Sequence, residues 1–220
     1  MPKNPRKPKK TDIGKSWQKQ VEPKPYKINR QKATDFLIVC EGQTERLYFQ
    51  SFPIQSAEVR SVALGTTPPN IVKYAKRNRQ GYDQVWCVFD MDHNPDKAKQ
   101  KEQFDNAIAA EKGNLKCAYS NDSFELWFVL HFQSCEQAEL RTRYNEILSG
   151  IWKISYSEEG KRERFAATIY QRLLKDGNAS QEQAIERAKQ LDNEHQGKPP
   201  HQQNPTTTVY KLVQELNKCL

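Results

Sequence analysis

The chain has 220 residues, 36% of them hydrophobic, and a formal net charge of +8 at pH 7. This length allows one folded domain with an extension, or two small domains. No run approaches the roughly 18 apolar residues of a membrane-spanning helix, and the polar start lacks the apolar segment of a secretory signal. Five cysteines are scattered without a C-x-x-C pair, which is typical of buried, reduced thiols. We therefore expect a soluble, cytoplasmic protein.

The positive charge is concentrated near the N-terminus. Residues 1–32 hold eleven of the 35 Lys and Arg residues but only two of the 27 Asp and Glu residues. Their apolar side chains are too few to offset the entropy of ordering, so we predict a disordered basic arm. Such an arm binds nucleic-acid phosphates by releasing counterions, and we expect Arg6, Lys9 and Lys10, on either side of Pro8, to contribute. A solubilising tail is the alternative interpretation.

Strand-like and helix-like segments alternate after residue 34. Strands are predicted at 36–40, 59–64, 85–89 and about 116–120. Helices are predicted at 44–52, from an Asn70 N-cap to Arg77, and at about 96–112. Strands that alternate with helices of this length imply βαβ units, and hence an α/β fold with a mainly parallel sheet flanked by helices.

After Phe124 the pattern becomes helical throughout. Helical stretches are expected near 136–149, 162–175, 180–195 and 206–218. Trp127 and His131 are expected to face the core, with His131 hydrogen-bonded internally. We therefore predict a basic arm at 1–32, an α/β domain at 33–132 and a helical extension at 133–220. The extension either caps the sheet or forms a small subdomain.

Two apolar runs end in acids. The run F-L-I-V-C-E-G-Q-T-E places Glu41 at the end of a strand and Glu45 one helical turn further on. The run V-F-D-M-D-H-N delivers Asp90 and Asp92, whose side chains we expect on the same side of an extended segment. Ligands bind at the carboxyl ends of strands in open α/β sheets, so these carboxylates are predicted to converge on one crevice. Their repulsion requires protons or a divalent cation to offset it.

The order of these acids resembles the Toprim fold, which topoisomerases, primases and OLD-type nucleases share. In that fold a first strand ends in Glu and a third in D-x-D, as at Glu41 and at Asp90 and Asp92. The chain more closely resembles the RloB-like family of bacterial defence proteins over about residues 34–216. The likeness lies in four consecutive blocks, V-C-E-G-Q-T-E, V-F-D-x-D, S-N-D-S-F-E-L-W-F-V-L-H-F and N-P-T-T-T-V-Y-K-L-V.

The resemblance implies a Toprim-like nuclease that cuts phosphodiesters with the help of Mg²⁺ or Mn²⁺. Phosphoryl transfer needs a positioned nucleophile, neutralised phosphate charge and a group that handles the leaving oxygen's proton. Asp90 and Asp92 are the first choice as metal ligands, with Glu41 either completing the site or acting as general acid or base. Glu45 is expected to add a catalytic carboxylate or hold a second metal ion, and Glu125 to join the others at the sheet edge.

The same resemblance implies partners and a biological role. The nucleic acid would be tRNA, another RNA or DNA, and an ATPase partner of the RloA type would control its cleavage in antiphage defence. A homodimer is a further expectation, because a sheet with a helical appendage can hide an apolar face by self-association. The alternative function is a non-catalytic module that binds nucleic acid or a partner, with a structural ion in the acid cluster.

Other polar residues have two interpretations each. His93 follows the D-x-D motif and could orient a phosphate, or it is a solvated loop histidine. Ser123 could contact substrate, or cap the helix near Phe124 as Ser120 and Asn121 could. Thr66 could offer its hydroxyl to a phosphate, or belong to a plain turn.

Three familiar motifs are excluded. Asp90, Asp92 and Asn94 match the start of an EF-hand loop, but Pro95 takes the glycine position and Lys101 replaces the final glutamate. A haloacid-dehalogenase-like phosphatase carries D-x-D on its first strand and Thr where this chain has Asn94. The sequence contains no Walker A motif or glycine-rich dinucleotide loop, which argues against ATP hydrolysis by this chain.

Overall fold

The computed structural model of the protein describes residues 34–94 and 99–220. The expected basic arm, with Arg6, Lys9 and Lys10, lies outside the described residues. Contacts divide the chain into two units, Met1–Lys32 and Ala33–Leu220, and the second unit contains every described residue. The expected division at residues 132 and 133 stays a prediction.

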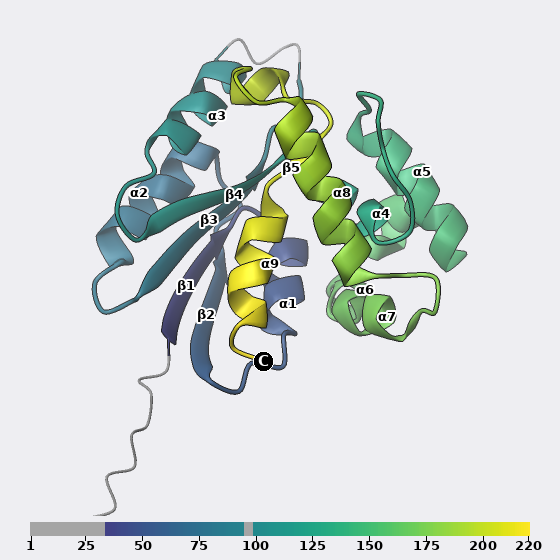
Figure 1. The fold of residues 1–220 in the computed structure, drawn as a ribbon, viewed down its shortest axis with the longest axis horizontal. Coiled ribbons are helices and arrows are strands. Elements are labelled where there is room, and N and C mark those ends of the chain that lie inside the picture. The colour runs from purple at the N-terminus through teal and green to yellow at the C-terminus, as the bar shows by residue number, and fades with distance from the viewer. Residues whose placement is uncertain (1–33, 95–98) are drawn as a thin grey trace, which may run out of the picture. The chain divides into compact units, whose positions relative to one another are not determined.

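A five-stranded sheet with the strand order β2-β1-β3-β4-β5 lies at the centre of the second unit (Figure 1). Strands β1 to β4 pair in parallel, and β5 pairs antiparallel with β4. The strands are β1 (Thr34–Cys40), β2 (Ala57–Ala63), β3 (Gln84–Asp90), β4 (Leu115–Asn121) and β5 (Thr206–Thr207). The structure therefore confirms the expected α/β fold with a mainly parallel sheet.

Helices cover both faces of the sheet (Figure 1). They are α2 (Pro68–Asn78) and α3 (Gln100–Ala109) on one face, and α1 (Gln43–Gln50) and α9 (Val209–Asn217) on the other. Leu37 and Val39 of β1 pack in the core under α2 and α3, whereas Phe36 and Ile38 pack in the core under α1 and α9. Burial on both faces explains why the strands have continuous apolar runs.

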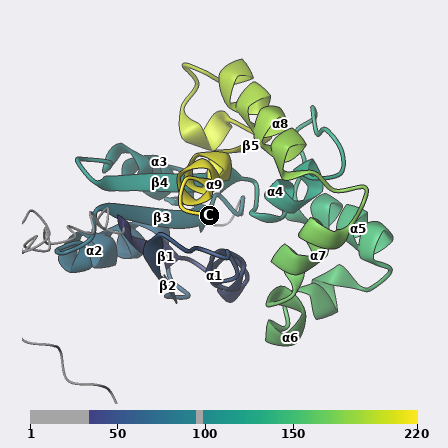
Figure 2. The ribbon, with the colours of Figure 1, turned by 60° about the horizontal axis from the view of Figure 1, so that its bottom comes forward.

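The remaining helices extend the core beside α1 and α9 (Figure 2). They are α4 (Glu125–Leu130), α5 (Arg141–Trp152), α6 (Glu163–Ala166), α7 (Ile169–Lys175) and α8 (Gln181–Glu194). The ring of Tyr48 on α1 joins them, with ring centroids 5.4 Å from Phe128 and 5.8 Å from Tyr170. Thus α9 packs on the sheet itself, and α4 to α8 share the same core. None of the helices in the described ranges combines the length and apolar character needed to cross a membrane.

The C-terminal part is not wholly helical, contrary to expectation. Thr206 and Thr207 form β5, and the last helix begins at Val209. The Ser120 and Thr207 hydroxyls lie 3.0 Å apart, and Thr208 Oγ1 accepts a hydrogen bond from the Tyr119 backbone N–H at 2.9 Å. These cross-strand hydrogen bonds and the β-branched side chains favour a strand here over the first helical turn.

Two helix boundaries also differ from the prediction. The helix expected to start at an Asn70 N-cap begins at Pro68 with Thr67 as N-cap, because prolines fit the first helical positions, where no N–H is needed. The Asn70 side chain instead donates to Thr66 Oγ1 at 2.9 Å. The stretch near 136–149 becomes helical only from Arg141. The stretch near 162–175 is divided into α6 and α7.

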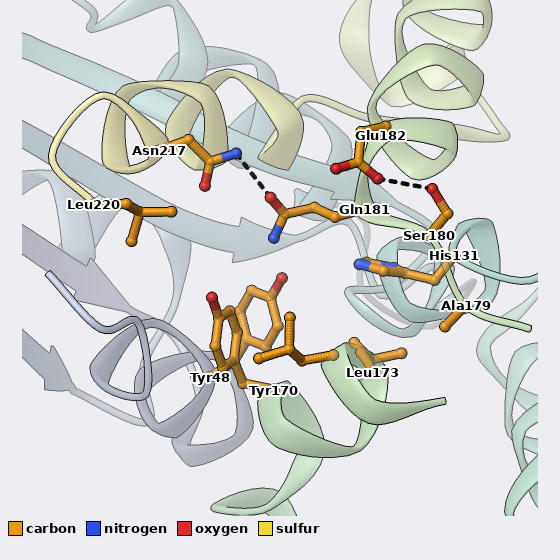
Figure 3. Close-up of a pocket in the computed structure, with 11 residues that line it drawn as sticks. Tyr48, His131, Tyr170, Leu173, Ala179, Ser180, Gln181, Glu182, Asn217 and Leu220 are labelled. Carbon is orange, nitrogen blue, oxygen red and sulfur yellow. Dashed lines mark hydrogen bonds between the residues drawn. The ribbon is translucent and has the colours of Figure 1, made fainter. Parts of the chain in front are cut away.

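Trp127 and His131 are buried in the core, as expected. The Trp127 indole N–H donates to the Tyr48 hydroxyl at 2.9 Å. His131 Nδ1 lies 2.9 Å from the Trp127 carbonyl oxygen, so Nδ1 carries the proton that is shared with it. The His131 ring is also among the side chains that line a pocket of about 430 Å³, with Tyr48, Tyr170 and Gln181 around it (Figure 3).

The burial of His131 predicts a loss of stability in mild acid. Burial lowers the pKa of His131 from 6.5 to about 4, although its hydrogen bond to Trp127 opposes the shift. The stabilising effect of the neutral ring is therefore present above pH 6.5 and is lost as pH falls toward 4. We expect the free energy of unfolding, measured with urea, to fall by about 2 kcal/mol more in the wild type than in His131→Gln between pH 7.5 and 4.5. His93→Gln, which changes an exposed loop residue, should follow the wild type. If the free energy of unfolding fell equally with pH in all three proteins, His131 would not be the origin of the acid sensitivity.

Candidate functional site

Carboxylates gather at the edge of the sheet where the parallel strands end. Glu41 directly follows β1, Asp90 is the last residue of β3, and Glu125 begins α4 after β4. Glu41 Oε2 accepts a hydrogen bond from the Asp90 backbone N–H at 3.3 Å. Asp90 and Glu125 are buried, with 5% and 3% of their surface exposed. The structure thus brings these acids together at the edge where the sequence placed them.

Asp92 reaches the same cluster by a different backbone path from the one predicted. Its φ of 46° is left-handed, so the segment is not extended through this residue. Asp tolerates that conformation better than most residues do. The side chains of Asp90 and Asp92 still meet, because both contact the same guanidinium nitrogen of Arg141. Met91 packs away from them, in the core under α2 and α3.

Arg141, the first residue of α5, lies among the acids. Its Nη2 is 3.0 Å from Asp90 Oδ2 and 2.5 Å from Asp92 Oδ1, and its Nε is 3.4 Å from Glu125 Oε2. Lys161 adds a second cation, with Nζ 3.4 Å from Glu125 Oε1. The repulsion that the sequence predicted is therefore offset in part by two cations that the sequence reasoning missed.

Asp122 holds the surrounding backbone and was also missed. Its Oδ1 accepts from the His93 backbone N–H at 2.6 Å, and its Oδ2 accepts from the Arg141 backbone N–H at 3.0 Å. The Asp122 carbonyl accepts from the Asp92 backbone N–H at 2.9 Å. One residue thus fixes the D-x-D loop and the start of α5 relative to each other.

Glu45 folds back over the N-terminus of its own helix, close to Gly42. A Cβ atom at Gly42 would lie 2.6 Å from Glu45 Oε2, so glycine leaves the space that this carboxyl group occupies. Burial raises the pKa of Glu45 to about 7, and repulsion from Glu125 and Glu41 adds to the shift. Glu45 can therefore hold or release a proton near neutral pH, which is the property of a general acid or base.

The other acids differ in their response to burial. Burial raises the pKa of Asp90 well above its usual value, against the effect of Arg141, and it raises the pKa of Asp92 in the same way. Burial also acts on Glu125, but Lys161 and Arg141 outweigh it and lower the pKa of this residue. Glu125 is therefore the member that the two cations keep charged, whereas burial favours the protonated forms of Glu45, Asp90 and Asp92.

Asp90 also binds the N-terminus of α4. Its Oδ2 accepts a hydrogen bond from the Phe124 backbone N–H at 2.9 Å, so this carboxylate satisfies an N–H donor at the start of the helix. The suggested caps are occupied elsewhere, Ser120 with Thr207 and Asn121 Nδ2 with the Pro200 and His201 carbonyls. The capping interpretation of Ser120 and Asn121 is therefore wrong, because Asp90 accepts the Phe124 amide and these two side chains pair with other groups.

The remaining predicted site residues lie around the cluster. Ser123 is fully buried between Asp122 and α4. His93 is exposed, and its backbone N–H is held by Asp122. Thr66 accepts from the Asn70 side chain, which agrees with a turn. A pocket of about 360 Å³ opens beside the acids. Its lining includes Glu41, Asp90, Asp92, Thr67, Lys99 and Gln103.

The donors of this cluster suit a hard divalent cation. All are carboxylate oxygens, the ligands that Mg²⁺ prefers, and the buried Asp90 Oδ1 has no hydrogen-bond partner within the described ranges. Among residues 34–94 and 99–220, however, no three His, Cys, Asp or Glu side chains are arranged so that they could hold a metal ion. The residue types therefore fit Mg²⁺, whereas their present spacing is set by Arg141.

The chain was compared with protein families, curated proteins and solved structures. A family model described as RloB-like protein matches residues 36–216, which is most of the chain. No curated protein and no solved structure matches the chain.

The raised pKa of Glu45 predicts that stability falls as pH rises. The protonated form is favoured in the folded state, so stability is full below pH 4.5 and is lost as pH rises through about 7. We expect Glu45→Gln to match the wild type at pH 4.5 and to exceed it by up to about 3 kcal/mol at pH 8.5, measured by urea unfolding with EDTA present. Glu186→Gln, which removes an exposed carboxylate on α8, should give no such gain. A constant difference between Glu45→Gln and the wild type at all pH values would contradict the prediction.

A methyl group at Gly42 should displace the Glu45 carboxyl group at little cost. The Gly42 backbone is extended, with a φ of −117°, so alanine fits the backbone, and the atom it meets is the far end of a flexible side chain. We expect Gly42→Ala to stay within about 1 kcal/mol of the wild type at pH 4.5, yet to lose most of the fall in stability at higher pH. Gly150→Ala, where no heavy atom lies within 4 Å of the new Cβ, is the matched control and should keep that fall.

Proposed function

Because the chain belongs to the RloB-like family, we propose that it is a metal-dependent nuclease of the Toprim type, which cuts nucleic-acid phosphodiesters. The observation that carries the proposal is the buried Asp90 carboxylate. It lies at the end of a central strand, beside Glu41, Glu45 and Asp92, and at the wall of an open pocket. Buried acids that repel one another reduce stability, so their grouping at a ligand-binding sheet edge supports a catalytic use.

The pocket beside the acids suits a phosphodiester. Glu41, Asp90 and Asp92 line one part of it, and Lys99 contributes a cation that can pair with phosphate oxygens. Thr67 and Gln103 add polar groups. The prolines Pro68 and Pro69 remove two backbone N–H donors from the start of α2, so in this proposal the phosphate is held by side chains rather than by that helix terminus.

The chain's own residues divide the chemical work. Asp90 and Asp92 are the proposed metal ligands, and Glu41 either completes that set or moves a proton. Glu45 holds a proton near neutral pH and is the proposed general acid or base, for which a pKa of about 7 is well matched. A divalent cation bound by these carboxylates supplies charge neutralisation at the phosphodiester. This scheme requires no tyrosine nucleophile.

The nucleic-acid substrate, the biological role and the partner protein are also proposed. We propose tRNA, another RNA or DNA as the nucleic acid, and antiphage defence as the role. An RloA-type ATPase partner would control cleavage, and the basic residues at 1–32 would add affinity for phosphates. These points derive from the resemblance in the V-C-E-G-Q-T-E and V-F-D-x-D blocks and from the charge of the chain.

One observation favours a second candidate function. Arg141 and Lys161 already offset part of the acid charge, as a structural ion would. A site neutralised in this way suits a non-catalytic module that binds nucleic acid or a partner protein. The two candidates differ in one respect that can be measured, namely whether Asp90 is needed for phosphodiester cleavage.

The nuclease proposal predicts metal-dependent cleavage that depends on Asp90. Purified protein would be incubated with labelled tRNA, single-stranded RNA and plasmid DNA, with Mg²⁺, with Mn²⁺ or with EDTA. We expect cleavage of at least one substrate with metal, and a loss of at least about 100-fold in Asp90→Asn, because removal of an outer-shell partner alone already costs about 10- to 100-fold and Asp90 is a proposed ligand. Glu186→Gln should cleave at the wild-type rate, since this exposed carboxylate lies on α8.

The binding-module alternative predicts a different result. In that case no substrate is cut under any metal condition, and salt-sensitive nucleic-acid binding is equal in the wild type and Asp90→Asn. Repeating the incubation with the ATPase partner and ATP distinguishes a module from a nuclease that is inactive alone. Circular dichroism of Asp90→Asn establishes that the variant is folded, because Asp90 also accepts the α4 amide of Phe124.

A further inference from the structure

Arg141 holds the carboxylates that the proposed function assigns to a metal ion. Its Nη2 contacts both Asp90 and Asp92, at 3.0 and 2.5 Å, and so lies between the two proposed ligands. The Arg141 Nε faces Glu125 at 3.4 Å. A guanidinium bridging these acids reduces their repulsion, so the cluster is tolerated without a divalent ion.

A guanidinium and a divalent cation cannot both lie against these carboxylates at low cost. Like charges a few ångströms apart repel strongly where water is excluded, and Asp90 is 5% exposed. On the basis of the proposed function, we propose that the Arg141 guanidinium competes with the metal ion for the Asp90 and Asp92 carboxylates. The Arg141 ion pairs and the metal-bound arrangement are then two alternative states of one site. In this scheme Arg141 sets how much divalent cation is needed before the site forms.

The contacts of Asp90 are consistent with such an exchange. Asp90 Oδ2 accepts from both Arg141 and the Phe124 backbone N–H, whereas Asp90 Oδ1 is buried without a hydrogen-bond partner within the described ranges. Arg141 therefore satisfies this carboxylate incompletely. A carboxylate with unused lone pairs in a low-dielectric setting favours any cation that can use them more fully.

The release of Arg141 needs only a side-chain rotation. The Arg141 backbone N–H is held by Asp122 Oδ2 at 3.0 Å, which fixes the start of α5. The guanidinium lies at the end of a flexible chain, and 31% of the side chain is exposed. The guanidinium can therefore leave the acids by rotation about its side-chain bonds, without movement of α5.

The test measures metal affinity rather than activity. Binding of Mn²⁺ to the full chain would be followed by electron paramagnetic resonance and by calorimetry, for the wild type, Arg141→Gln and Arg141→Lys. We expect Arg141→Gln to bind Mn²⁺ at least about tenfold more tightly, since about 1.4 kcal/mol of competing interaction corresponds to that factor. Arg141→Lys, which keeps the charge but lacks the planar fork, should fall between the two. Arg143→Gln is the matched control, because this exposed arginine on the same helix pairs with Glu146 at 3.0 Å and, within the described residues, with no acid of the cluster.

Each result supports or overturns the inference. Equal or weaker Mn²⁺ binding in Arg141→Gln than in the wild type overturns the competition and leaves the nuclease proposal standing. Absence of Mn²⁺ binding in every protein overturns both, because the nuclease proposal requires a metal ion. If Arg141→Gln fails to fold, the Nε–H signal of Arg141 in the wild type gives the answer by nuclear magnetic resonance. We expect this signal to lose protection from solvent exchange when Mg²⁺ is added, and an unchanged signal at saturating Mg²⁺ would contradict the inference.

Discussion

Carboxylates can be buried together at the edge of a sheet only if charge of the opposite sign or protons accompany them. In this protein Arg141 meets that requirement for Asp90, Asp92 and Glu125 at once. The guanidinium belongs to α5, so the C-terminal helices are tied to the strand ends by charge as well as by their shared apolar core. The position of α5 and the shape of the acid cluster therefore depend on each other.

The same arrangement gives each acid a different character. Lys161 and Arg141 lower the pKa of Glu125 and keep it charged. The carboxyl group of Glu45 is buried next to Gly42, and its pKa is raised. The cluster is thus divided into Glu125, which its cations keep charged, and three carboxyl groups whose pKa values burial raises. Acid–base chemistry needs this separation of pKa values. It follows from differences in burial and in neighbouring cations rather than from the residue types.

The sequence was sufficient for the four parallel strands and the grouping of acids, because continuous apolar runs ending in Glu41 and Asp90 carry that information locally. Arg141 could not be found in this way, because its partners lie 16 or more positions away and it stands in a stretch that reads as an ordinary helix. Asp122 lies in the S-N-D-S-F-E-L-W-F-V-L-H-F block. Its role depends on three backbone contacts with distant residues, which the spacing of residues in the sequence does not predict. Thr206 and Thr207 were predicted as a helix start because their pairing with β4 is a tertiary interaction.

The order of charges along the chain has a consequence for its synthesis. Glu41, Asp90 and Glu125 all precede Arg141 and Lys161 in the sequence. A ribosome adds about 5–20 residues per second, so Asp90 leaves it about 3–10 seconds before Arg141 does, and Glu125 about 1–3 seconds before. During that interval the strand ends depend on protons or ions from the surroundings. The newly made sheet edge is therefore exposed to the ionic composition of the cell before the finished protein shields it.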